Sequence, residues 1–147
     1  MFDFVIIDGG HSMGNISLKL LEISDTALIV SNLSIPCLAN TNKLLKSFYD
    51  LGYPERERIN IVINRYLKNS NISIEDAEKS FDKKIFRTIP NDYNTTVSAI
   101  NKGKPLTQFA SNERITENFR QMASSFSPSC EEKEGKKKRK FWKFFSL

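Results

Sequence analysis

Two polar residues each follow a short apolar run in the first half of the sequence. Asp8 ends the run Phe2–Ile7, and Asn64, with Arg65 after it, ends the run Ile59–Ile63. Such runs predict strands buried on both faces, and ligands of parallel sheets bind where the carboxyl ends of the strands meet. A carboxylate there can reach Mg²⁺ through water beside nucleotide phosphates, and an amide can read an adenine edge. The alternative for both residues is a turn at a strand end.

A third polar segment, Pro90-Asn91-Asp92, follows the apolar residues Ile85–Ile89. Proline fixes the turn, and Asn91 or Asp92 can cap a helix that ends at Gly103. A fixed turn before a capped helix can form one wall of a base pocket. The alternative is an ordinary strand, loop and helix that bind nothing.

Strands and helices alternate along the chain, which predicts βαβ units and an α/β fold with a mostly parallel sheet flanked by helices. We expect a partial α/β domain over residues 1–126, a polar linker over 127–135 and a basic tail over 136–147. Strands are predicted at Phe2–Ile7, Ala27–Val30, Ile59–Ile63 and Ile85–Ile89, and helices at 12–23, 34–51, 73–81, 91–103 and 113–126.

Taken in order, four segments resemble CpaE/TadZ-type pilus-assembly proteins of the MinD/ParA superfamily of P-loop ATPases. They are FDFVIIDGGHS, SDTALIVSNLSIPCLANTNKLLKSFYDLGY, INIVINRY and FRTIPNDYNTTVSAINKGKPL, and the resemblance covers about residues 2–125. It implies that Asp8 is the Walker B aspartate that holds Mg²⁺ through water and that Asn64 reads adenine. It also implies that Pro90–Asp92 form the loop beside the base, and that ATP and Mg²⁺ are the cofactors of the parent family. The predicted nucleotide-binding residues are therefore Asn64, Arg65, Pro90, Asn91 and Asp92.

The phosphate-binding loop of that family is not found in these 147 residues, because no G-x-x-x-x-G-K-[ST] occurs. That loop supplies the backbone N–H cradle and the lysines that neutralise phosphate charge. We therefore expect a P-loop-like sheet without the Walker A strand. The strands at Phe2–Ile7 and Ala27–Val30 are then either separated by a gap or paired directly. The chain alone is expected to have no ATPase activity, and to bind ATP and Mg²⁺ weakly or not at all.

The last twelve residues are basic and aromatic. At 100° per residue the aromatic side chains share one arc and most of the basic ones lie opposite, as in an interfacial membrane anchor. MinD proteins similarly end in an amphipathic membrane-targeting helix. The alternatives are a disordered solubilising tail and a nucleic-acid arm. The predicted membrane-binding residues are Lys136, Arg139, Lys140, Phe141, Trp142, Lys143, Phe144 and Phe145.

Charge and hydropathy exclude several classes of protein. The net charge is +5, and the tail carries six positive charges, so subtracting six from five leaves the rest near −1. A nearly neutral body argues against a nucleic-acid-binding face. No apolar run approaches the roughly 20 residues that span a bilayer, and the N-terminus lacks the features of a signal peptide. The predicted location is cytoplasmic, and peripheral at the inner membrane.

These features together predict an ATPase-family protein that assembles or positions a pilus or secretion apparatus at the membrane. The expected partners are proteins of that machinery, the anionic membrane surface and a second copy of the chain; nucleic acid is not expected. The alternative is a non-enzymatic adaptor, recruited to the membrane, that keeps the family's partner-binding surface.

Overall fold

The computed structural model describes residues 3–10 and 14–126. The chain divides into two compact units, one up to Asp92 and one from Tyr93 onward. The predicted linker and tail, residues 127–147, lie outside the described residues.

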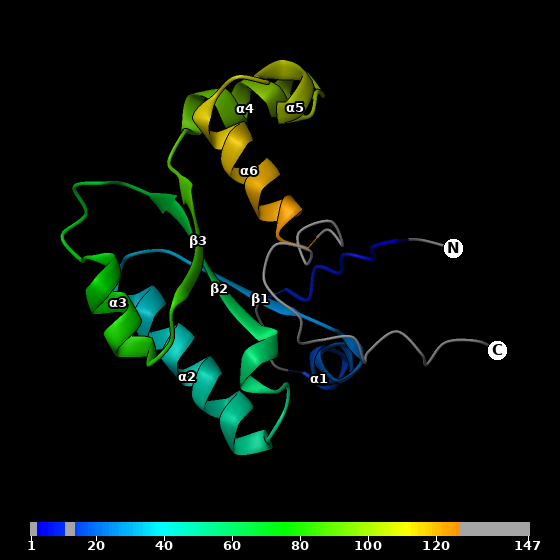
Figure 1. Ribbon diagram of the computed structural model, residues 1–147, viewed down its shortest axis with the longest axis vertical. Helices are drawn as coiled ribbons and strands as arrows, with labels where there is room; N and C mark the ends of the chain where they lie inside the picture. Colours follow the sequence, from blue (N-terminus) through cyan, green and yellow to red (C-terminus); the bar gives the residue numbers. More distant parts are fainter. Residues whose placement is uncertain (1–2, 11–13, 127–147) are drawn as a thin grey trace, which may run out of the picture. The chain divides into compact units, whose positions relative to one another are not determined.

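The first unit contains a parallel sheet of three strands in the order β1-β2-β3 (Figure 1). The strands are β1 (Ala27–Ser31), β2 (Ile59–Tyr66) and β3 (Ile85–Pro90). β1 and β2 pair without interruption, with Ile29 opposite Ile61. The prediction of an α/β fold with a parallel sheet is confirmed, and three of the four predicted strands form.

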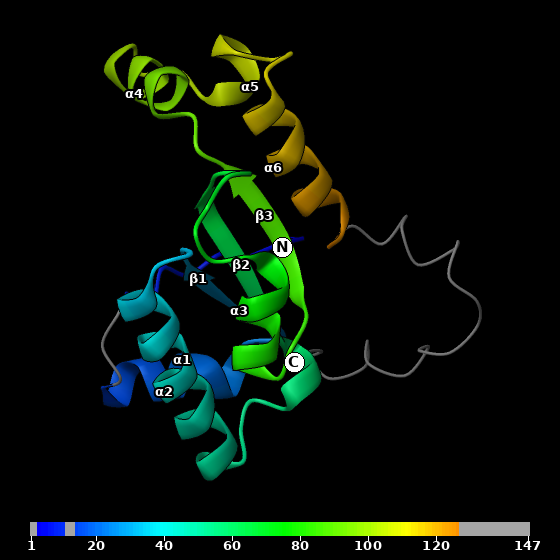
Figure 2. The ribbon, with the colours of Figure 1, turned by 90° about the vertical axis from the view of Figure 1, so that its left-hand side faces the viewer.

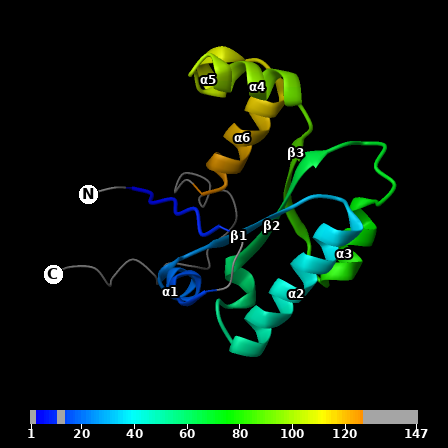
Figure 3. The same ribbon diagram turned by 180° about the vertical axis from the view of Figure 1, so that it is seen from behind.

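Two helices, α2 (Ile35–Leu51) and α3 (Ile74–Phe81), lie side by side and supply the helical half of the core (Figures 2 and 3). Between β1 and β3, β2 provides the most deeply buried residues of the sheet. A preceding helix, α1 (Asn15–Ile23), contributes only the partly buried Leu21. The core consists of Ile29, Leu38, Leu45, Phe48, Ile59, Ile61, Ile63, Ala77 and Phe81.

The ends of α2 and α3 follow the capping signals in the sequence. Gly52 ends α2 with φ of 72°, and its N–H donates to the carbonyl of Tyr49. This left-handed position suits glycine because glycine has no Cβ. At the start of α3, the Ser73 Oγ accepts a hydrogen bond of 3.0 Å from the Asp76 N–H. Both helices are therefore confirmed where they were predicted.

Polar contacts tie the helix layer to the start of β2. A short 3₁₀ helix, η1 (Arg56–Arg58), precedes β2. The Arg56 guanidinium donates to the Asp82 carboxylate at 2.7 Å and to the Asp82 carbonyl, and it lies over the Tyr49 ring. The Lys83 ammonium donates to the Arg56 carbonyl at 2.8 Å. Since Tyr49 belongs to α2 and Asp82 follows α3, these contacts fix both helices against the loop that leads into β2.

The predicted strand at Phe2–Ile7 is wrong over its described residues. Asp3–Gly10 form no strand, and their side chains are exposed, Ile6 to 96%. Backbone N–H and C=O groups require partners when a strand is buried, and this segment pairs with none of β1, β2 and β3. Of the two arrangements expected, direct pairing with β1 is therefore not formed.

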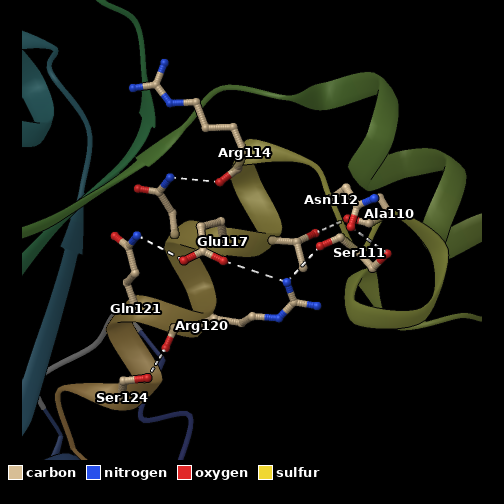
Figure 4. Close-up of polar contacts among 10 residues, drawn as sticks. Ala110, Ser111, Asn112, Arg114, Glu117, Arg120, Gln121 and Ser124 are labelled. Carbon is tan, nitrogen blue, oxygen red and sulfur yellow. Dashed lines mark hydrogen bonds and ion pairs between the residues drawn. The ribbon is translucent and has the colours of Figure 1, made fainter. Parts of the chain in front are cut away.

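The second unit is helical within its described residues. It contains α4 (Tyr93–Asn101), α5 (Leu106–Phe109) and α6 (Arg114–Ser124), so the two long helices predicted here are confirmed. Figure 4 shows how α6 is held to the turn before it, because the Arg120 guanidinium donates to the Ser111 carbonyl at 2.8 Å. The Thr116 hydroxyl donates to the Ala110 carbonyl at 2.6 Å. Among the described helices of the chain, none is long and apolar enough to cross a membrane.

Candidate functional site

The carboxyl ends of β2 and β3 lie next to each other. Tyr66 of β2 is opposite Pro90 of β3, and the Asn91 N–H donates to the Tyr66 carbonyl at 3.0 Å. The segment Asn64–Arg65 and the segment Pro90–Asp92 therefore meet at one edge of the sheet. These are all five of the predicted nucleotide-binding residues, and the structure brings them together.

A β-bulge that no pattern in the sequence predicts shapes this edge. Ile63 is opposite Thr88 and Tyr66 is opposite Pro90, so two residues of β2 lie opposite one residue of β3. The extra residue is accommodated at Arg65, which has φ of 52°. Bulges re-aim side chains and are over-represented beside active sites. The positive φ of Arg65 marks the bulge in the structure, but an arginine in the sequence does not indicate a positive φ.

The bulge leaves Asn64 exposed at the strand end. Its Oδ1 accepts a hydrogen bond of 2.9 Å from the Arg65 N–H. An amide oxygen has two lone pairs and an amide nitrogen has two hydrogens, so the side chain keeps capacity for one further acceptor bond and two donor bonds. This capacity fits the edge of an adenine, which presents both a donor and an acceptor.

Asp8 lies in an exposed turn instead of at the end of a strand. Its Oδ1 accepts a hydrogen bond of 3.0 Å from the Gly10 N–H, two residues away. The rigid support that a buried strand was expected to give this carboxylate is therefore lacking, and its role as a Mg²⁺ ligand stays a prediction. Within residues 3–10 and 14–126, no three His, Cys, Asp or Glu side chains gather in a way that could hold a metal ion.

A small cavity follows β2. Its volume is about 170 Å³, and it is lined by Tyr66, Lys68, Ser70 and the start of α3 at Ser73. Ligand pockets usually enclose roughly 300–1,000 Å³, so this cavity is small for a nucleotide base. The sequence carries no signal for this cavity, because Ser70 and Ser73 are equally typical of an ordinary loop and helix cap.

Among the comparisons with known proteins, only the one with solved structures finds similar proteins. No protein-family model and no curated protein matches the sequence. A ParA family ATPase from Chlorobium tepidum is similar over 77% of this chain and 47% of its own, with 26% identity and a TM-score of 0.71. The cell division ATPase MinD of Pyrococcus furiosus is similar over 84% of this chain and 51% of its own, with 25% identity and a TM-score of 0.67.

A third structure is the septum site-determining protein MinD of Pyrococcus horikoshii, in complex with Mg-ADP. It is similar over 81% of this chain and 48% of its own, with 20% identity and a TM-score of 0.64, which shows a common fold. The chain thus spans about half the length of these solved structures. With its parallel sheet and flanking helices, the chain has the P-loop NTPase-like fold of the MinD/ParA superfamily of ATPases, and the matches support a place in that superfamily.

Proposed function

We propose that this chain carries the adenine-binding side of a CpaE/TadZ-type MinD/ParA ATPase, which assembles or positions a pilus or secretion apparatus at the membrane. The observation that carries the nucleotide part is the meeting of Asn64 with Pro90–Asp92 at one sheet edge. The similarity to ParA and MinD ATPases supports the superfamily, and one MinD relative is in complex with Mg-ADP. Because the chain spans about half of these proteins, the activity of a whole ATPase is part of the proposal.

The proposed site residues of this chain serve the base of the nucleotide more fully than its phosphates. Asn64 reads the adenine edge, and Pro90–Asp92 form a wall beside the base. Asp8 would be the residue that holds Mg²⁺, and the ion would supply positive charge beside the phosphates. The phosphates also need the N–H cradle and the lysine of a Walker A loop, which these 147 residues do not contain. Base recognition is therefore expected without phosphate fixation, and turnover is not expected.

A titration with fluorescent ATP and GTP, labelled on the ribose, tests the adenine site. The full chain is expected to bind the ATP analogue more tightly than the GTP analogue. Asn64→Ala should weaken ATP binding about fivefold, as expected for the loss of roughly 1 kcal/mol of hydrogen bonding. Asn69→Ala is the matched control, because Asn69 is an exposed asparagine in the loop after β2. Equal affinity for the two nucleotides, or no effect of Asn64→Ala, would contradict the site.

An ATP turnover assay tests the expected lack of activity. Positioning and electrostatic stabilisation supply nearly all of the catalysis of phosphoryl transfer, so the purified chain should release no phosphate above background. Asp8→Ala is the control for contaminating ATPases. Turnover that this substitution abolishes would show that the chain does contain a phosphate site.

Co-sedimentation with lipid vesicles tests the membrane part of the proposal, which rests on the sequence of Lys136–Leu147. Each basic residue near an anionic surface contributes about 1 kcal/mol, and salt screens this attraction. The full chain should sediment with anionic vesicles, less so at high salt, and a chain ending at Gly135 should not. Equal sedimentation of the two proteins would rule out the tail as the anchor.

Two further outcomes separate the rival functions. Replacing Phe141, Trp142, Phe144 and Phe145 by serine should abolish vesicle binding. If the substituted chain still binds vesicles, and if the chain binds DNA more tightly than lipid, the tail is a nucleic-acid arm. Vesicle binding without any nucleotide affinity would favour the membrane-recruited adaptor over the ATPase.

A further inference from the structure

We draw no further inference here: the strongest candidate, the small cavity between the end of β2 and the start of α3, would recognise a ligand mainly through the amino terminus of that helix, and nothing else among the described residues points to a ligand there.

Discussion

Two segments of this chain, Phe4–Ile7 and Ile59–Ile63, are similarly apolar in sequence but differ in structure, because only the second forms a buried strand. Both are short, apolar and followed by a polar residue, Asp8 or Asn64. The second lies in β2, between β1 and β3, and Ile59, Ile61 and Ile63 are completely buried. The first forms no strand and is exposed.

The difference lies in the neighbours and not in the segments themselves. β2 has a hydrogen-bonded strand on each side and the helices α2 and α3 over one face. The N-terminal segment has no paired strand, so a buried position would leave its peptide groups unsatisfied, at about 1–3 kcal/mol for each. An apolar run therefore forms a buried strand only where a neighbouring strand can pair with its backbone.

The largest expected effect comes from truncating the same residue type in the two segments. Ile61→Ala should lower the free energy of unfolding by about 2–5 kcal/mol, because it leaves a cavity in the core. Ile6→Ala should change it by less than about 0.5 kcal/mol, as is usual for exposed positions. Urea denaturation followed by circular dichroism measures both. A similar cost for both variants would show that the N-terminal segment is buried after all.

A smaller effect is expected from two carboxylates, Glu78 of α3 and Asp8 of the N-terminal segment. The Glu78 Oε1 accepts from the Ile85 N–H at 2.9 Å, and its Oε2 lies 2.6 Å from the Lys84 ammonium, so Glu78 fixes the start of β3. Glu78→Gln should therefore cost about 1 kcal/mol at neutral pH. Asp8→Asn, which affects only an exposed turn, should cost less than about 0.5 kcal/mol.

The pH dependence of the Glu78 effect has a definite sign. The hydrogen bond from Lys84, and then the one from the Ile85 N–H, hold the pKa of Glu78 below its ordinary value of 4.5. A carboxylate with a lowered pKa stabilises the fold above its ordinary pKa, and this contribution is lost as the pH falls through the lowered value. The difference between wild type and Glu78→Gln should thus shrink below pH 4.5. A difference that stays constant in acid would contradict this account.

An effect of similar size concerns the backbone. Arg65 has φ of 52° in a position fixed by the β2–β3 pairing, and Gly10 has φ of 68° in the unpaired segment. Arg65→Val should cost about 1 kcal/mol, because a β-branched residue is strained at positive φ, while Arg65→Gly should not destabilise. Gly10→Val should have almost no effect, since the unpaired backbone can relax. Thermal melts of the three variants resolve the order.

Local signals predicted most of the fold. Ser73 and Gly52 marked a helix start and a helix end, because capping depends on residues close in sequence. The alternation of elements predicted the parallel sheet, and it thereby placed Asn64 near Pro90–Asp92. The lack of a strand at Asp3–Ile7 and the bulge at Arg65 were not predictable, because both depend on pairing with residues far along the chain.

The spatial order of the sheet is also the order of its strands along the chain. Among the described strands, β2 pairs with β1 before it and β3 pairs with β2 before it, so β2 and β3 each add to an edge that already exists. Domains fold as units during synthesis. As the ribosome releases this chain, β1, α2 and β2 can assemble before β3 has been translated, and α3 can close over them next. These three described strands can therefore pair in the order of translation, and none of the three must later be inserted between the other two.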